Sequence, residues 1–232
     1  MEFSRREFLG LAAGSSAIGL ASRWRRTSLW AGTRGAFREF ALLDCGSACT
    51  IKESLAGYES ALIGSGIPYR RISVLPASAV HDLIVPAAHL GDRSVLRQLK
   101  TCWHRGATLL FESGATFLEG GEFEVHRRVV ESEFGIRLGA PRPLWGSPES
   151  RRQAPYLRYQ WPASAMVRDF SRLIPVDCEG GENIAYFQEL PVAAKRHAES
   201  GTLVFLGSPL GPHLLAGDRE ARIWFKAFCS SC

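Results

Sequence analysis

The sequence predicts an α/β domain with three layers, in which a mainly parallel β-sheet lies between two layers of helices and an antiparallel ribbon follows toward the C-terminal end. Three observations predict this fold. Short segments that are apolar throughout alternate with segments whose apolar residues recur at helical spacing. Strands that are apolar on both faces are typical of a parallel sheet covered by helices on both sides. Two adjoining strand-like segments near residue 190 have the pattern of a hairpin.

The first half of the domain supplies strands and helices in alternation. We expect strands at 38–43, 69–75, 83–85 and 108–111, and helices at 52–65 and 94–105. Gly64 and Gly66 are expected to end the first helix, because glycine adopts the left-handed conformation of a helix C-cap without strain. Pro86 is expected to end the third strand.

Right-handed crossovers between parallel strands bring the turns after Leu43, Val85 and Phe111 to one edge of the sheet. We call this the carboxyl edge, because the carboxyl ends of the parallel strands meet there. Ligands bind at this edge in open α/β sheets. The polar residues that follow these strands are therefore candidates for a binding site.

The second half is expected to add a helix at 123–134, paired strands at 183–190 and 191–197, a strand at 202–206, and a helix at 219–228 that Asp218 caps. Residues 139–163 read as an irregular excursion in which aromatic residues and arginines interleave. These residues are Trp145, Tyr156, Tyr159, Trp161, Arg142, Arg151, Arg152 and Arg158. Such side chains stack on sugar rings or hold carboxylates, form a protein-binding surface, or plug the end of a sheet, and the sequence leaves these alternatives open.

Residues 1–35 are expected to be an export signal with a basic leader, and residues 36–232 the domain. Arg5 and Arg6, followed by Phe8 and Leu9, resemble the twin-arginine export signature. The apolar run 9–21 is too short to span a bilayer comfortably and has the length of a signal-peptide core. The sequence therefore predicts export to the periplasm or cell envelope through the twin-arginine translocase. It leaves open whether the signal is cleaved or retained as an anchor.

Charge and cysteine content limit the class of protein. Of the net charge of +5, the six arginines and two glutamates of residues 1–35 contribute +4, which leaves +1 for the domain. This argues against a nucleic-acid partner, since a nucleic-acid-binding domain concentrates basic residues on a folded face. The pair Cys229 and Cys232 could be a disulfide, a redox pair or half of a metal site. We expect buried thiols with at most one disulfide, no metal and no cofactor.

Three segments together resemble the class I glutamine amidotransferase-like superfamily, which has a flavodoxin-like fold. They are 82–86 (DLIVP), 107–115 (ATLLFESGA) and 201–213 (GTLVFLGSPLGPH). In the enzymes of that superfamily, a G-x-C-x-G elbow presents a nucleophilic cysteine and a later His-x-Glu completes a triad. This sequence has Ser113 in place of the cysteine, and Ser208 and Pro209 follow Gly207 where the His-x-Glu would stand. The resemblance implies the fold, and glutaminase activity is not expected.

The candidate catalytic residues are Ser113 as nucleophile, His213 as its base and Glu112 as an acid-base or orienting carboxylate, with His89 as an alternative base. Asp44, His89 and Ser208 are candidate ligand-binding residues at the carboxyl edge. The competing interpretation is that Ser113 caps a turn and Glu112 binds backbone amides or an arginine. His126 and His197 are expected at the surface, without a function.

Three functions remain open. The chain is first expected to be an exported binding or accessory module without the catalytic triad, whose ligand is a carbohydrate or envelope-derived group or whose partner is a protein. The first alternative is a secreted serine-type hydrolase that uses Ser113. The second is an accessory subunit of an exported redox enzyme, which the export signal and Cys229–Cys232 would allow.

Overall fold

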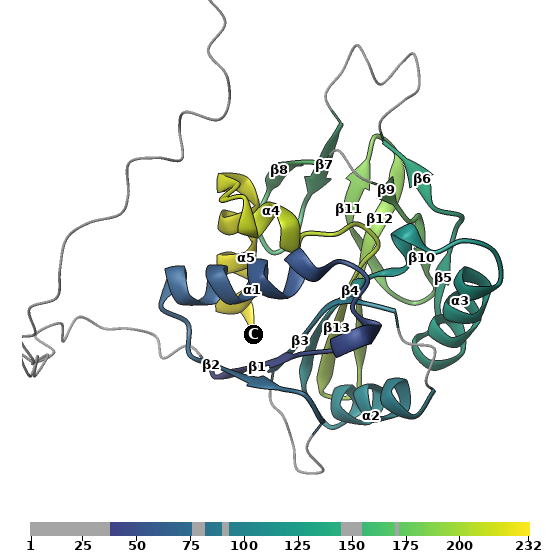
Figure 1. The fold of residues 1–232 in the computed structure, drawn as a ribbon, viewed down its shortest axis with the longest axis horizontal. Coiled ribbons are helices and arrows are strands. Elements are labelled where there is room, and N and C mark those ends of the chain that lie inside the picture. Colours follow the sequence, from purple (N-terminus) through teal and green to yellow (C-terminus); the bar gives the residue numbers. More distant parts are fainter. Residues whose placement is uncertain (1–37, 76–81, 90–92, 145–154, 170–171) are drawn as a thin grey trace, which may run out of the picture. The chain divides into compact units, whose positions relative to one another are not determined.

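The computed structural model describes residues 38–75, 82–89, 93–144, 155–169 and 172–232 (Figure 1). The predicted export signal and leader, residues 1–35, lie outside the described residues. So do Trp145, Arg151 and Arg152 of the excursion.

A nine-stranded sheet forms the centre of the described chain. Its strands lie side by side in the order β2 (Tyr69–Ile72), β1 (Phe40–Leu43), β3 (Asp82–Ala88), β4 (Thr108–Ser113), β13 (Gly201–Leu206), β12 (Leu190–Ala198), β11 (Glu182–Phe187), β7 (Tyr156–Tyr159) and β8 (Ala165–Arg168). The strands from β2 to β13 are parallel. From β13 to β8 each neighbouring pair is antiparallel. The sheet is therefore mixed, with its parallel part built mostly from the first half of the chain.

Smaller elements complete the described structure. Two further sheets pair β5 (Ile136–Leu138) with β10 (Val176–Cys178), and β6 (Arg142–Pro143) with β9 (Arg172–Leu173). The helices are α1 (Lys52–Ser65), α2 (Arg93–His104), α3 (Gly120–Phe134), α4 (Gly211–Leu215) and α5 (Arg219–Ser231). Two short 3-10 helices, η2 (Gly46–Ala48) and η3 (Ala115–Phe117), follow β1 and β4.

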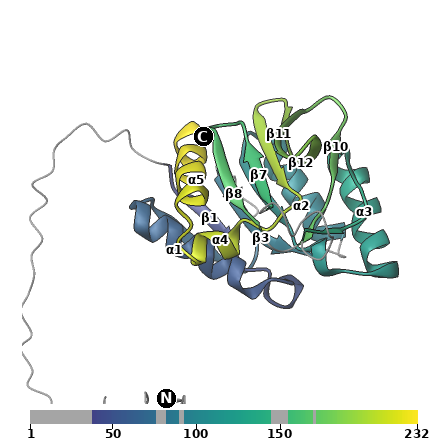
Figure 2. The same cartoon turned by 90° about the horizontal axis from the view of Figure 1, so that it is seen from above.

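Helices cover the parallel part of the sheet on both faces, with α1, α4 and α5 on one side and α2 and α3 on the other (Figure 2). Each face has its own hydrophobic core. Phe40 and Leu42 of β1 belong to the core under α1, α4 and α5, whereas Ala41 and Leu43 belong to the core under α2 and α3. Successive side chains of a strand point to opposite faces, so an apolar strand supplies both cores at once.

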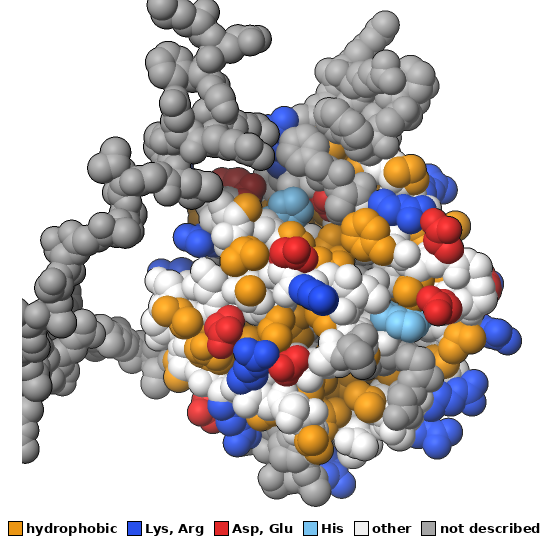
Figure 3. All heavy atoms as spheres, in the orientation of Figure 1, with side chains coloured by type: hydrophobic (Ala, Val, Ile, Leu, Met, Phe, Trp, Pro, Cys, Tyr) orange, Lys and Arg blue, Asp and Glu red, His pale blue; other side chains and the backbone are white. Residues whose placement is uncertain are grey.

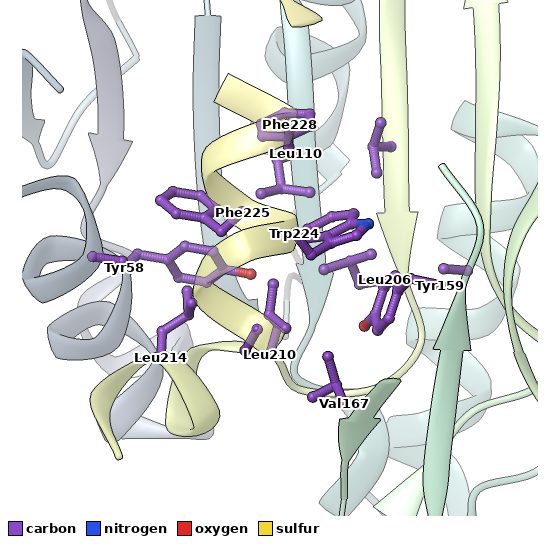
Figure 4. Close-up of a cluster of buried hydrophobic side chains, with 14 of the residues drawn as sticks. Tyr58, Leu110, Tyr159, Val167, Leu206, Leu210, Leu214, Trp224, Phe225 and Phe228 are labelled. Atoms are coloured by element: carbon purple, nitrogen blue, oxygen red, sulfur yellow. The ribbon is translucent and has the colours of Figure 1, made fainter. Parts of the chain in front are cut away.

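The core under α5 shows how sequence spacing produces packing. Ala221, Trp224, Phe225 and Phe228 recur at the spacing of one helix face and are all buried. The Trp224 ring lies 4.8 Å from the ring of Tyr159 of β7, centroid to centroid. In Figure 4 the side chains of Trp224 and Phe228 lie beside Leu110 and Leu206 of the sheet. Helix α5 thereby holds the antiparallel half of the sheet to the parallel half.

The α/β fold with a parallel central part is confirmed, as is the antiparallel ribbon formed by β11 and β12. Helix α1 has the predicted bounds and ends at Gly66, which has φ +66° and donates its N–H to Ile63 and Leu62. Asp218 caps α5, because its Oδ1 accepts a hydrogen bond of 2.9 Å from Ala221 N.

Two predictions about local structure are wrong. Pro86 does not end β3, which continues to Ala88 through an irregular register opposite β4. The register of β3 with β1 stops at Ile84, so the missing N–H of Pro86 removes no bond of that pairing. The excursion 139–163 is not irregular throughout, because it contains β6 and β7. Burial alternates along β7, which is the pattern of a strand with one covered face.

Candidate functional site

Glu112 lies near the carboxyl end of β4 and is completely buried. Its Oε1 accepts a hydrogen bond of 2.6 Å from Ser54 Oγ, and its Oε2 accepts one of 2.6 Å from Tyr58 OH. Oε2 also accepts the backbone N–H groups of Leu210 and Gly211, at 3.0 and 2.9 Å. Burial raises the pKa of Glu112, against the effect of its four donors. The carboxylate therefore connects β4, α1 and the start of α4.

Small residues permit this connection between α1 and α4. A Cβ at Gly57 would lie 1.8 Å from the carbonyl oxygen of Gly211, and a Cβ at Gly211 would lie 2.4 Å from Ser54 Cα. Only glycine at these two positions lets the helices approach closely enough for Glu112 to reach the N–H groups of Leu210 and Gly211. The interpretation in which Glu112 binds backbone amides describes this geometry.

Ser113 points to the opposite face of the sheet from Glu112. It is buried, and its Oγ lies 3.2 Å from Nε2 of His126 on α3. The Oγ also accepts a 3.3 Å hydrogen bond from Ala115 N, which is the turn-capping contact of the competing interpretation. Because adjacent residues of a strand face opposite sides, Glu112 and Ser113 cannot act on the same reacting atom in this conformation.

The expectation that His126 lies at the surface is wrong, because its side chain is completely buried on the inner face of α3. Its Nδ1 has no hydrogen-bond partner among the described residues. Burial, together with the neighbouring His89 at 6.0 Å between ring centroids, lowers the pKa of His126 to about 3. A serine triad needs a carboxylate that orients the histidine, and the described contacts of His126 include none.

The backbone beside Ser113 is tightly packed. Ala87 of β3 has φ +37°, an uncommon conformation for a residue with a Cβ. A Cβ at Gly114 would lie 2.0 Å from the carbonyl oxygen of Ala87 and 2.4 Å from Thr50 Oγ1. The ends of β3 and β4 therefore meet in close contact with the segment after η2. Ser113 itself does not have the positive φ that a strained nucleophile elbow would give it.

His213 lies on α4 and is partly exposed. Its Nε2 is 3.6 Å from Oδ1 of Asp169, which follows β8 and is completely buried. Ser208 Oγ donates a hydrogen bond to Asp169 Oδ2. The structure thus brings together His213 and Ser208, two predicted residues, through a carboxylate that the sequence did not single out. Ser113, by contrast, is on the α3 side of the sheet.

Asp44 and His89 lie at the same edge, next to η2. Asp44 Oδ2 accepts a 2.7 Å hydrogen bond from Arg71 Nη2, and this bond holds the pKa of Asp44 below its ordinary value. The N–H of His89 donates to the carbonyl of Ala48 at 2.8 Å. Both side chains are partly exposed. They are accessible polar groups, unlike Glu112 and Ser113.

The cysteines are all free thiols. Burial raises the pKa of Cys45 to about 12 and that of Cys232 to about 12, and it also raises the pKa of Cys229. These thiols therefore resist ionisation in the folded chain. In the described ranges, no three His, Cys, Asp or Glu side chains are grouped to hold a metal ion.

Asp169 and His126 are the residues that the sequence did not identify. Asp169 follows β8, which lies beyond the excursion 139–163 and was not predicted as a strand, so no strand end marked it. His126 recurs at helical spacing with the apolar positions of α3, with Phe123 three residues before it and Val129 and Val130 after it. That spacing is the signal that would have placed it on the buried face.

On the face shown in Figure 3, Lys and Arg side chains are interspersed with Asp and Glu. No helix within the described residues has both the length and the apolar character needed to cross a membrane.

No protein-family model and no curated protein matches this chain. Solved structures do. A GH42 β-galactosidase from G. stearothermophilus superposes with a TM-score of 0.57 at 15% identity over 85% of this chain. A cytoplasmic protein of Salmonella typhimurium LT2 gives 0.59 at 10% identity, over 84% of this chain and 99% of its own. A ThuA-like protein from Bacteroides uniformis ATCC 8492 gives 0.53 at 10% identity, over 85% and 93%.

The chain spans only 30% of the β-galactosidase and 35% of a similar exo-β-1,4-mannosidase from Opitutaceae bacterium strain TAV5. At these identities the likeness concerns the fold alone. It shows that the chain shares its fold with these proteins, one of which is described as ThuA-like.

Proposed function

We propose that this chain is an exported binding or accessory module on an amidotransferase-like fold. The observation that carries the proposal is the placement of Glu112 and Ser113 on opposite faces of β4, each buried and each held by its own neighbours. Because Glu112 and Ser113 cannot both reach one reacting atom, they are poorly placed to act together in catalysis. Each is instead well placed to hold neighbouring elements together.

The proposed binding site is the carboxyl edge, where Asp44, His89 and His213 are partly exposed. The proposed ligand is a carbohydrate or envelope-derived group. The likeness to segments of a β-galactosidase and a mannosidase supports this choice, since these two proteins are named for their action on carbohydrates. The twin-arginine pattern at Arg5 and Arg6 supports a location outside the cytoplasm.

Binding is tested with the full chain on an array of glycans and cell-envelope fragments. A ligand should bind without being converted, and His213→Ala should weaken its binding. His197→Ala, which changes an exposed histidine on β12, is the matched control. Conversion of a bound glycan or ester by the wild-type protein, lost in Ser113→Ala, would contradict a non-catalytic role.

Export is tested by fractionating cells that produce the full chain. Changing Arg5 and Arg6 together to Lys should retain the protein in the cytoplasm, because the signature depends on the arginine pair. The control changes Arg23 and Arg25, which lie after the apolar run, to Lys. An unchanged distribution in the first variant would argue against the proposed route.

A serine-type hydrolase is the second candidate, and the 3.2 Å approach of Ser113 Oγ to His126 Nε2 favours it. Both groups are buried, so a substrate could reach them only if α3 moved. Hydrolysis of a chromogenic ester that is abolished by Ser113→Ala and retained in Ser208→Ala would establish this candidate. Equal background rates in wild type and both variants would exclude it.

A further inference from the structure

At the edge of the sheet, β7 and β8 have one covered and one exposed face. Along β7 and β8, Leu157, Tyr159, Ala165 and Val167 are buried in the core under α5. The alternate residues point the other way and are exposed: Tyr156, Arg158, Met166 and Arg168. Tyr186 of β11 lies in the same row as Arg158 and is partly exposed. We call these five side chains the β7–β8 face.

The β7–β8 face arranges its side chains in cross-strand rows. One row places Met166, Arg158 and Tyr186 directly opposite one another, and the next places Arg168 opposite Tyr156. Side chains directly opposite one another on adjacent strands are about 4.5–5.5 Å apart, so a ligand held at Arg158 can also contact Met166 and Tyr186. Tyr156 and Met166 are 42% and 46% exposed, which offers apolar surface beside Arg158.

Arg158 is held by a ring and not by a carboxylate. Its guanidinium lies 5.8 Å from the centre of the Tyr186 ring, and it forms no ion pair with the described residues. Two other exposed arginines differ, because Arg71 pairs with Asp44 and Arg137 with Asp177, each at 2.7 Å. A guanidinium stacked on a ring keeps its hydrogen-bonding edge available to a planar anion.

The charges of the face select the ligand. None of its five positions is acidic, and Glu182 on β11 is already paired with Lys195 at 2.9 Å. A carboxylate-bearing ligand therefore meets arginine without a competing acid from these positions. Tyrosine rings offer flat apolar surface to the apolar side of a sugar ring.

A protein partner fits these observations less well. At the edge of β8, one backbone donor is already used, because Met166 N donates to Glu220 Oε2 of α5 at 3.4 Å. The face also comprises five side chains, whereas a stable protein interface uses about 20–30 residues on each side. A short, repeating anion suits the available area better.

We propose that the β7–β8 face binds an acidic polysaccharide, with Arg158 holding a sugar carboxylate and the tyrosines contacting the rings. This surface shares no residue with the carboxyl edge. It adds a second binding surface to the molecule and does not depend on the first.

Alginate, a polymer of uronic acids, is the test ligand, and its binding to the full chain is measured by calorimetry at low and high salt. Arg158→Gln should weaken binding about tenfold, and Tyr186→Ala should weaken it as well, because the ring holds the guanidinium. Binding should also weaken as the salt concentration rises, because the ion pair between Arg158 and the sugar carboxylate is exposed to solvent. Arg137→Gln, which removes an exposed arginine elsewhere, should leave it unchanged.

Two comparison ligands separate the sources of binding. Neutral dextran should not bind, and polyglutamate should bind more weakly than alginate because it has no sugar rings. No binding of alginate, equal binding of polyglutamate, or equal loss in Arg158→Gln and Arg137→Gln would overturn the proposal. His213→Ala should retain alginate binding, because His213 lies at the carboxyl edge and not on the β7–β8 face. The two proposed binding surfaces can therefore be tested independently.

Discussion

Replacing Glu112 by alanine tests the central feature of the site, the buried carboxylate that joins β4 to α1 and α4. The change removes the acceptor of four hydrogen bonds: those from Ser54 Oγ, Tyr58 OH, Leu210 N and Gly211 N. The side chain is completely buried, so no bulk water takes its place.

The size of the effect follows from the donors that are left without an acceptor. Each buried, unsatisfied donor costs about 1–3 kcal/mol, so four donors set a range of about 4–12 kcal/mol. Relaxation and entry of a water molecule reduce this, and we expect a loss of about 4 kcal/mol in the free energy of unfolding. Since domains are stable by about 5–15 kcal/mol, the variant should be close to unfolding.

Urea denaturation followed by circular dichroism measures the loss. The matched control is Glu119→Ala, whose side chain is 83% exposed and pairs with Arg172 at 3.6 Å. An exposed pair of this kind should change stability by less than about 1 kcal/mol. If Glu112→Ala lost no more than Glu119→Ala, the structural role assigned to Glu112 would be refuted.

The charge of Glu112 gives a second measurement. Burial raises the folded pKa above the ordinary value of 4.5, so the folded chain binds this proton more tightly than the unfolded chain. The stabilisation from that proton is present below the unfolded pKa and is lost as the pH rises through the folded pKa. Glu112→Gln cannot ionise, so its stability relative to wild type should improve as the pH rises above 4.5. A constant difference would contradict the raised pKa.

Two further predictions concern packing and a buried histidine. Gly57→Ala should destabilise the protein by about 2 kcal/mol or more, because its Cβ would collide with the carbonyl oxygen of Gly211 and push α4 away from α1. The control is Gly64→Ala on the same helix, where an added Cβ would have nothing within 4 Å. This control should be neutral or stabilising by up to about 1 kcal/mol. Thermal melts of both variants check this, and equal melting temperatures would refute the close approach. His126 has a folded pKa of about 3, so the unfolded chain takes up a proton below pH 6.5 that the folded chain does not, and stability should fall by about 2 kcal/mol between pH 7 and pH 5. His126→Gln should remove that part of the pH dependence and the exposed-site variant His197→Gln should keep it; urea titrations at the two pH values distinguish these outcomes.

Local sequence determined the elements whose signals are complete within one segment. The apolar strands of the parallel half, the C-cap at Gly66 and the N-cap at Asp218 each depend on residues within a few positions. The strands β7 and β8 lacked such a signal, because their exposed rows carry arginine, tyrosine and methionine in a segment rich in proline and arginine. β7 pairs with β11, which is distant in sequence, and β8 pairs in turn with β7.

The sequence predicted the places of the candidate polar residues along the chain, but not their partners. Glu112 and Ser113 lie at the end of β4 and Ser208 follows β13, whereas His213 lies further on, in α4. Only the tertiary structure decided that Glu112 reaches α1 and α4, that Ser113 meets His126 beneath α3, and that Asp169 joins Ser208 to His213. The physical reason is that strand alternation fixes the side of the sheet that a residue faces, whereas the partner that it finds there depends on the packing of helices and loops from other parts of the chain.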